Sequence, residues 1–300
     1  MTVNGTPNGT TYHLNNNNKI NNNNNDVVSV VIVGAGNFGA ATALSLAKKG
    51  VKVTLVDTAC YPNPRAASHD VNKIVRDDYP DTLYMRMQLR AMPMWRKDRL
   101  YSRFFHQVGM LRADPSNCGD QSMAAYNAVG AHNVSRYMSV EEVRKRWNGA
   151  FATSNFGGLD RVLYNPSVGF AEADKALGAV VQAAIDRGVK YVVGEMTRLT
   201  FGMRGECTGI ELKDGRVLQA DKVVMATGAR TGTLLAQSAP KNKKLHVGNR
   251  LLATGAVSFY ARLRGAQKDK FAPIPVLKNC LPEVKGANSS SDAVWKIMAG

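Results

Sequence analysis

The stretch from Val28 to Asp57 constrains the fold more than any other part of the chain. A run of β-branched apolar residues leads into the pattern G-x-G-x-x-G, formed by Gly34, Gly36 and Gly39. The three glycines suit, in that order, a tight turn, the close approach of backbone to a pyrophosphate, and close packing of a helix on a strand. The stretch therefore predicts a βαβ unit that binds a dinucleotide.

The other parts of this unit agree with that prediction. Residues 28–33 predict a parallel strand buried on both faces, residues 40–49 a helix, and residues 51–56 a second strand. The first turn of the helix would point its unpaired N–H groups at the pyrophosphate. Asp57 follows the second strand, 21 positions after Gly36, where a carboxylate can accept hydrogen bonds from ribose hydroxyls.

Beyond this unit the chain alternates between helical and strand patterns. Ser139, followed closely by two glutamates, predicts the N-cap of a short helix, and the Asp-Gly pair at 214–215 predicts a hairpin turn. The other predicted elements are a helix over 81–100 interrupted at Pro93, a strand over 104–112, strand and turn over 157–170, a helix over 171–187, a strand over 189–193, a buried strand and turn over 221–229, a long strand over 251–263, an edge segment over 271–277 and a strand from 293.

The charge balance of the chain is strongly basic. Lys and Arg number 39 against 23 Asp and Glu, a formal net charge of +16. Such an excess is typical of proteins that bind nucleic acid, anionic membranes or acidic ligands. The basic residues are scattered, however, and the densest cluster, Lys241, Lys243 and Lys244, has no interleaved aromatic residues. We therefore expect no nucleic-acid partner.

The cysteine positions and the absence of targeting signals in the sequence limit the compartment and the kinds of site that we expect. The four cysteines are widely separated and form no C-x-x-C pair, so neither a zinc site nor a disulfide framework is expected, and a reducing compartment is the default. No apolar run reaches the roughly 18 residues of a membrane span, and no secretory signal opens the sequence. Residues 1–26 are dominated by asparagine, which predicts a disordered leader. We expect a protein that is not secreted, has no membrane partner and binds no metal.

From Val28 to about Leu281 the sequence resembles the flavin amine oxidases related to monomeric sarcosine oxidase, fructosyl amino acid oxidase and saccharopine or pipecolate oxidase, within the D-amino-acid oxidase superfamily. The motifs that carry the resemblance are G-A-G-N-F-G at 34–39 with Asp57, S-H-D-V-N-K-I-V-R at 68–76, N-P-S-V-G-F-A-E-A-D-K-A-L at 165–177 and V-V-M-A-T-G-A at 223–229.

This resemblance implies an α/β fold in which a Rossmann-like FAD-binding domain is interleaved with an α+β substrate domain built on an antiparallel sheet. Residues 27–90 and 150–235 would form the FAD-binding domain, and residues 91–149 and 236–300 the substrate domain. It also implies that a secondary amine of an N-substituted amino acid is oxidised to an imine, with FAD as cofactor and dioxygen as acceptor, giving hydrogen peroxide.

Specific residues follow from the same resemblance. Lys73 would lie beside the flavin, Arg76 would bind the substrate carboxylate through a bidentate guanidinium, and Lys270 would assist the reaction of oxygen. The implied cofactor-binding residues are Gly34, Gly36, Asn37, Phe38, Gly39, Asp57, Ser68, Asn72, Lys73, Val193, Ala226, Thr227 and Gly228.

Alternatives stay open at several of these positions. Lys73 also fits a solvated loop, and Arg76 also fits the protein surface. Lys268 is placed as well as Lys270, and His69 fits a packed or solvated loop better than a catalytic base. The family's covalent flavin link uses a cysteine well beyond residue 300, for which Cys280 is a poor substitute.

Two other functions remain open beside the oxidase: a flavin dehydrogenase that uses another electron acceptor, and a truncated, non-catalytic paralogue. The resemblance implies a small-molecule amine or amino acid substrate, a monomer, and a cytoplasmic or peroxisomal location. Because the family's later flavin- and substrate-binding segments fall after residue 300, we expect these 300 residues expressed alone to be poorly soluble and inactive.

Overall fold

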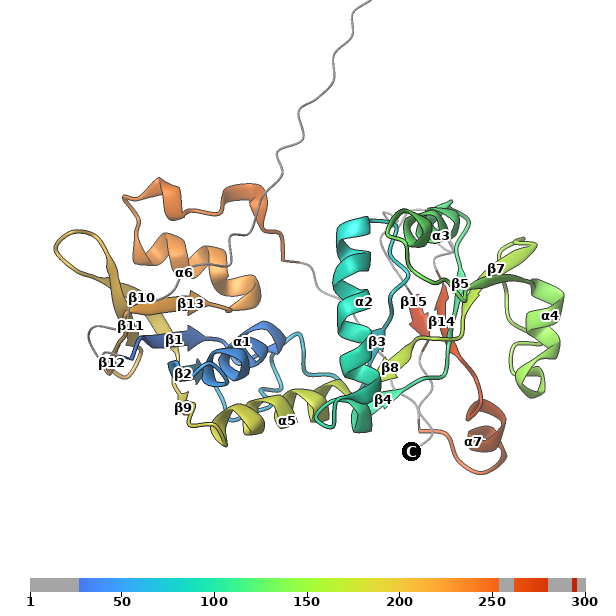
Figure 1. Ribbon diagram of the computed structural model, residues 1–300, viewed down its shortest axis with the longest axis horizontal. Coiled ribbons are helices and arrows are strands. Elements are labelled where there is room, and N and C mark those ends of the chain that lie inside the picture. The colour runs from blue at the N-terminus through green and yellow to red at the C-terminus, as the bar shows by residue number, and fades with distance from the viewer. Residues whose placement is uncertain (1–26, 254–261, 280–292, 296–300) are drawn as a thin grey trace, which may run out of the picture.

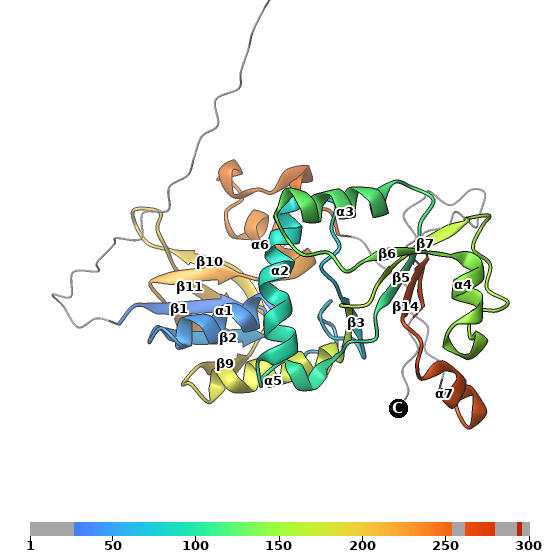
Figure 2. The same cartoon turned by 45° about the vertical axis from the view of Figure 1, so that its right-hand side comes forward.

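The structure is a computed structural model that describes residues 27–253, 262–279 and 293–295. Its elements form two groups, one built on a parallel sheet and one on a mixed sheet, and helix α2 (Thr82–Lys97) stands between them in both views (Figures 1 and 2). The predicted leader and Cys280 lie outside the described residues.

The first group is a four-stranded parallel sheet with helices on one face. Its strand order is β13-β1-β2-β9, so the strands before and after the glycine pattern pair directly with each other. Parallel neighbours bring all four carboxyl ends to one edge of the sheet, where ligands bind in open α/β folds. The elements are β1 (Ser29–Val33), α1 (Asn37–Ala47), β2 (Lys52–Asp57), α5 (Ala173–Ile185), β9 (Lys190–Val193) and β13 (Lys222–Met225).

Alternation along β1 and β2 gives this sheet two buried faces. Val30 and Ile32 point to the core shared with α1 and α5, whereas Val31 and Val33 point to the opposite core. That second core is closed by a three-stranded antiparallel sheet and by α6 (Thr231–Ser238). The antiparallel strands are β10 (Met196–Phe201), β11 (Cys207–Leu212) and β12 (Val217–Gln219). The predicted hairpin between β11 and β12 is confirmed.

The second group is built on a five-stranded mixed sheet with the order β15-β14-β5-β7-β6. Its strands β14 and β5 are parallel and its other pairs antiparallel. The elements are β5 (Met110–Ala113), α3 (Cys118–Ala128), β6 (Arg136–Ser139), α4 (Val140–Lys145), β7 (Arg161–Asn165), α7 (Ala266–Phe271), β14 (Val276–Asn279) and β15 (Ala293–Trp295). The predicted N-cap is confirmed, because the hydroxyl of Ser139 accepts a hydrogen bond from Glu142 N at 3.0 Å.

A small antiparallel sheet lies between the two groups. It has the order β3-β8-β4, and its first strand is the K-I-V part of the S-H-D-V-N-K-I-V-R motif. The strands are β3 (Lys73–Val75), β4 (Phe105–His106) and β8 (Gly169–Ala171). Five 3₁₀ helices connect the described elements: η1 (Ser102–Phe104), η2 (Trp147–Gly149), η3 (Gly228–Arg230), η4 (Lys243–Leu245) and η5 (Gly248–Arg250).

Three predictions are wrong in the described residues, and a fourth is described only at its ends. The helix predicted to be interrupted at Pro93 is the continuous α2, which holds Pro93 inside it. The single strand predicted over 104–112 is two strands in different sheets, because Gly109 turns the chain with a φ of 79°. The segment predicted as an edge, 271–277, ends in β14, which has a paired strand on each side. The described ends of the long strand predicted over 251–263 carry no strand, and its remaining residues lie outside the described ranges.

The boundaries of the two domains stay a prediction. The parallel sheet takes all its strands from the ranges assigned to the FAD-binding domain. Strand β7, which lies in one of those ranges, pairs instead with β5 and β6 of the mixed sheet.

Candidate functional site

The glycine turn between β1 and α1 is fixed by close backbone packing at two of its three glycines. Gly34 has a φ of 99°, and a Cβ there would overlap the carbonyl oxygen of Ala226. A Cβ on Gly39 would overlap the carbonyl oxygen of Gly34. Both glycines are therefore required by the fold itself, because only they let α1 and the end of β13 approach the turn so closely.

Gly36 differs from the other two glycines because, among the described residues, no backbone atom lies where its Cβ would be. A Cβ on Gly36 would meet only the hydroxyl of Ser68, at 3.1 Å, and the backbone angles of φ −69° and ψ −174° suit any residue. Gly36 caps α1 without a side-chain hydrogen bond, and the first turn of α1 has no acidic residue. The missing side chain therefore leaves a cradle in front of the N-terminus of α1, where the Ser68 hydroxyl accepts from the first N–H, that of Asn37. Such a cradle fits a pyrophosphate.

Ser68 lies at the rim of this cradle. Its hydroxyl accepts a hydrogen bond from the backbone N–H of Asn37 at 3.0 Å. The serine therefore joins the S-H-D-V-N-K-I-V-R motif to Asn37, the first residue of α1. The cofactor contacts of both residues stay predictions. Phe38, the next predicted contact, projects to solvent with 82% of its surface exposed.

Asp57 is buried at the end of β2 and is held by donors from the protein. Its Oδ2 accepts from the backbone N–H of Ala35 at 2.6 Å. Its Oδ1 accepts from Thr58 N at 2.6 Å and from Asn63 Nδ2 at 2.5 Å. A carboxylate has about four acceptor positions, so Oδ2, with the N–H of Ala35 as its donor among the described residues, keeps capacity for a ribose hydroxyl.

The remaining predicted cofactor residues of the parallel sheet lie along the same edge. Ala226 follows β13, and its N–H donates to Val33 O at 2.8 Å, which sets it beside the glycine turn. Thr227 comes next and Gly228 turns the chain with a φ of 55°. Val193 ends β9 on the far side of β2, with 44% of its surface exposed.

The predicted flavin neighbours lie on the small sheet. Asn72 is 4% exposed, and Lys73 begins β3, opposite Ala171 of β8. The ammonium group of Lys73 lies 2.8 Å from Asp70 Oδ2, and 46% of the lysine side chain is exposed. The structure therefore gives Lys73 one acidic partner and free access to solvent or a ligand.

Arg76 does not lie on the open surface. Its side chain is 17% exposed, and its Nη1 donates to the carbonyl oxygen of Asp78 at 2.6 Å and to Asp78 Oδ1 at 3.1 Å. The guanidinium carbon lies 4.0 Å from the ring centre of Tyr79. The arginine is thus fixed at one nitrogen and covered on one face.

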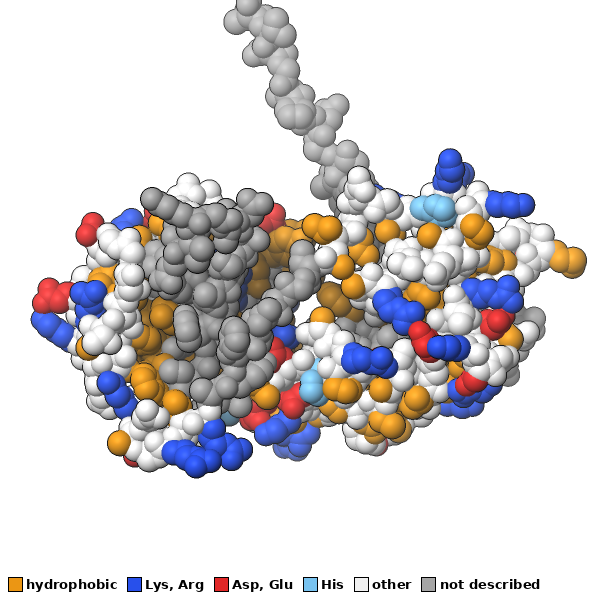
Figure 3. Space-filling view, turned by 180° about the vertical axis from the view of Figure 1, so that it is seen from behind, with side chains coloured by type: hydrophobic (Ala, Val, Ile, Leu, Met, Phe, Trp, Pro, Cys, Tyr) orange, Lys and Arg blue, Asp and Glu red, His pale blue; other side chains and the backbone are white. Residues whose placement is uncertain are grey.

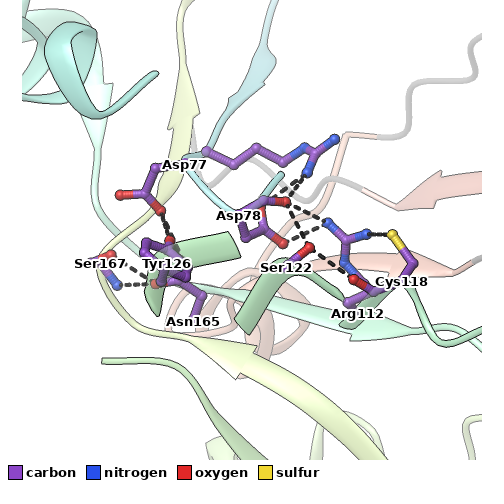
Figure 4. Close-up of polar contacts among 9 residues, drawn as sticks. Asp77, Asp78, Arg112, Cys118, Ser122, Tyr126, Asn165 and Ser167 are labelled. Carbon is purple, nitrogen blue, oxygen red and sulfur yellow. Dashed lines mark hydrogen bonds and ion pairs between the residues drawn. The ribbon is translucent and has the colours of Figure 1, made fainter. Parts of the chain in front are cut away.

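Asp77 and Asp78 anchor a buried polar network that we did not predict (Figure 4). Asp78 binds Arg112 of β5, with Oδ2 2.5 Å from Nη2. Asp77 Oδ1 accepts from the hydroxyl of Tyr126 at 2.6 Å and from Asn165 Nδ2 at 3.1 Å. The available signal was the acidic pair directly after the N-K-I-V-R strand, since buried carboxylates need paired donors.

The network sets the electrostatics of Tyr126. Burial, followed by the hydrogen bond to Asp77, raises the pKa of the Tyr126 hydroxyl well above its ordinary value of 10.0. The hydroxyl is therefore a hydrogen-bond donor at every physiological pH.

Lys270 is not brought together with the other predicted catalytic residues. It lies on α7, with its ammonium group 5.7 Å from the ring centre of Phe271. In both ribbon views α7 is at the opposite end of the molecule from α1 (Figures 1 and 2). Lys268 lies on the same short helix. His69 is half-buried in a turn, where its N–H donates to Ala66 O.

Other features of the described residues bear on ligand classes. No described helix combines the length and the apolar composition that a membrane crossing needs. Within the same residues, no three His, Cys, Asp or Glu side chains are grouped so that they could hold a metal ion. From behind, the Lys and Arg side chains are spread over both groups with acidic side chains among them (Figure 3). This view shows no continuous basic surface of the kind that binds nucleic acid.

One surface hollow, of about 350 Å³, lies away from these residues. It is formed by the Tyr61–Pro62 turn, α5 and the segment around Leu100. None of its lining residues belongs to the predicted site, so we attribute it to the packing of α5.

Comparison with known proteins gives one family. The sequence model of the FAD-dependent oxidoreductases (DAO) matches residues 29–279. L-saccharopine oxidase of Schizosaccharomyces pombe is 26% identical over 267 residues, which are 83% of this chain and 59% of that protein. Monomeric sarcosine oxidase of Bacillus sp. (strain B-0618) is 27% identical over 215 residues, 69% of this chain and 53% of that protein.

The fold has a solved counterpart. A thermally stable mutant of fructosyl peptide oxidase superimposes with a TM-score of 0.67 at 25% identity, over 84% of this chain and 60% of that one. The chain thus spans little more than half the length of the relatives it matches.

Proposed function

The chain belongs to the family of FAD-dependent oxidoreductases, and from this premise we propose that the whole protein oxidises the secondary amine of an N-substituted amino acid, with dioxygen as the electron acceptor. The relatives support this substrate class, since sarcosine, saccharopine and fructosyl peptides are all N-substituted amino acids or peptides. The products would be an imine, which water hydrolyses, and hydrogen peroxide.

The single observation that carries the proposal is the cradle in front of Gly36. A side chain there would occupy the space next to Ser68, and the N–H groups of the first turn of α1 lie behind it, that of Asn37 already donating to Ser68. In the proposal these N–H groups bind the FAD pyrophosphate and Oδ2 of Asp57 accepts from a ribose hydroxyl. When bound, FAD supplies the hydride acceptor and the reactivity toward dioxygen.

The substrate side of the proposal rests on Arg76 and Lys73. Arg76 keeps donors on one edge of its guanidinium, which suits a ligand carboxylate. Lys73 begins strand β3, which ends one residue before Arg76, and would set positive charge beside the flavin ring. Ala226, Thr227, Gly228 and Val193 would line the cofactor along the edge of the parallel sheet. Residues of the mixed sheet would form the substrate domain.

A spectrum and an amine panel test this function. The full-length protein, purified by gel filtration, should carry flavin absorption in the protein peak. Added sarcosine, saccharopine or a fructosyl amino acid should bleach that absorption in the absence of air, and air should restore it with release of peroxide. A protein without flavin would contradict the cofactor assignment. If air restores the bleached flavin absorption only slowly, the oxidase function is excluded and the dehydrogenase function remains.

A further inference from the structure

Asp78 binds two arginine side chains at once. Its Oδ1 accepts from Nη1 of Arg76 at 3.1 Å, and its Oδ2 accepts from Nη2 of Arg112 at 2.5 Å (Figure 4). Its backbone carbonyl accepts from the same two nitrogens, at 2.6 Å and 3.2 Å. The Asp78 side chain is 1% exposed, so both contacts are shielded from water, where charge-assisted hydrogen bonds are strong.

The Arg112 side of this arrangement is built into the mixed sheet. Arg112 lies on β5 with its side chain 2% exposed, and its Nη1 donates to Sγ of Cys118, at the start of α3, at 3.0 Å. The hydroxyl of Ser122, one turn along α3, lies 3.4 Å from the Asp78 carbonyl oxygen. Asp78 is therefore immobilised by a strand and a helix that belong to the other side of the molecule from the glycine turn.

The Arg76 side is left open toward a ligand. Nη1 is the nitrogen that contacts Asp78, and the ring of Tyr79 covers one face of the guanidinium at 4.0 Å. Among the described residues, neither Nη2 nor Nε of Arg76 has a recorded hydrogen bond. Because the guanidinium group is planar, holding Nη1 and covering one face fixes the direction of the edge formed by Nη2 and Nε. A carboxylate binds such an edge through two N–H groups.

The charge count of the trio favours an anion on that edge. Two guanidinium groups share the single carboxylate of Asp78, so one positive charge remains. The neighbouring carboxylate of Asp77 pairs with another cation, its Oδ2 lying 4.0 Å from Nη2 of Arg96. Asp78 therefore does not pair with Arg76 alone, because Arg112 binds the same carboxylate.

We propose that Asp78 is a positioning residue: held by Arg112, it fixes Arg76 so that the free edge of the guanidinium receives the carboxylate of the substrate. This inference rests on the proposed function, because it needs a carboxylate-bearing substrate. It extends the site to residues that do not touch the substrate and links substrate binding to β5 and α3.

The variant Asp78→Asn separates positioning from simple electrostatics. Removing a negative charge beside Arg76 would, by charge alone, strengthen the binding of an anion. Loss of positioning would weaken the binding of an anion, because the side-chain amide of the Asn variant no longer accepts hydrogen bonds from both arginines. We therefore expect the Asn variant of the FAD-loaded full-length protein to bind propionate about tenfold more weakly or worse, measured by perturbation of the flavin spectrum. Propionamide, which has the same shape and no charge, should bind both proteins equally.

Three comparisons complete the test. Asp81→Asn, at the exposed N-cap of α2, should leave propionate binding unchanged. In flavin-free protein, amide hydrogen exchange over residues 76–79 should be faster in Asp78→Asn than in the wild type. If Asp78→Asn does not fold, Asp78→Glu, which keeps the charge but displaces it, should show the same selective loss of propionate.

The outcomes are distinguishable. Equal or tighter propionate binding by a folded Asp78 variant overturns the positioning role while leaving the proposed function intact. Equal losses for propionate and propionamide also overturn it, because they indicate general damage to the fold. A wild-type protein that binds flavin but no carboxylate removes both the positioning role and the proposed substrate class.

Discussion

The backbone N–H of Ala35 donates a hydrogen bond of 2.6 Å to the side-chain oxygen Oδ2 of Asp57. The acid predicted to bind ribose therefore also ties the middle of the glycine turn to the neighbouring strand. Its other oxygen is held by Thr58 and Asn63. In the proposed function, cofactor binding and the shape of the turn therefore depend on the same buried carboxylate.

This dual role predicts the effect of Asp57→Asn. The amide group must direct an N–H toward one of the donors, so at least one charge-assisted hydrogen bond is lost, at a cost of about 1.5–3 kcal/mol. We expect a lower free energy of unfolding together with loss of most of the flavin, measured by urea titration and by absorbance. Asp221→Asn is the matched control on the exposed end of the same sheet, and it should retain its flavin.

The two kinds of glycine in the turn should respond differently to substitution. Gly36→Val places a side chain in the open cradle, so we expect a folded protein without FAD. Gly39→Ala drives a methyl group into the carbonyl of Gly34, so we expect a destabilised protein. Circular dichroism with thermal unfolding, beside flavin content, distinguishes the two effects. Stoichiometric flavin in Gly36→Val would show that this turn does not hold the cofactor.

Substituting Arg76 by alanine should act selectively on acidic substrates. Loss of a buried charge-assisted pair costs on the order of 2–5 kcal/mol, so carboxylate-bearing amines should bind at least tens of times more weakly. Uncharged amines should be little affected, and KM for the two substrate types reports the difference. Arg86→Ala, on the exposed side of α2, is the control. Equal losses of affinity for both substrate types would indicate that Arg76 has a structural role and does not bind the substrate carboxylate.

The raised pKa of Tyr126 predicts a pH dependence of stability. Because the folded protein keeps the hydroxyl protonated above its ordinary pKa of 10.0, the stabilisation is fully present below pH 10 and is lost as the pH rises beyond it. Tyr126→Phe should lower the free energy of unfolding at pH 7 by about 1.5–3 kcal/mol and reduce its alkaline decline. Urea unfolding at pH 7 and pH 10.5 measures both. An unchanged alkaline slope would assign that decline to other groups.

The cofactor half was predictable because its signals are local. Gly34, Gly36 and Gly39 report backbone geometry directly, and apolar residues on both faces of 29–33 indicate a doubly covered strand. The helix start was placed three residues late, since Gly36 caps α1 without the usual polar side chain. The FAD-dependent family and the α/β class were both confirmed.

The substrate side was less predictable because its signals are long-range. The Asp78 partners Arg76 and Arg112 lie 2 and 34 positions away, and no local pattern joins the second to it. Gly109 breaks a continuous apolar pattern through one positive φ, which the pattern itself does not show. Lys270 was assigned by resemblance within a region of weak motifs, and the structure places it on a remote helix. The roles of these residues stay predictions.

The pairing of β1 with β13 has a consequence for synthesis on the ribosome. The backbone and hydroxyl of Ser29 bind the carboxylate of Asp221, so one edge of β1 stays unpaired until 192 further residues have been synthesised. At about 5–20 residues per second, the delay is on the order of 10–40 s. During that interval the nascent parallel sheet offers an unpaired apolar edge, and this is the stage at which a chaperone that shields strand edges would raise the yield of folded protein.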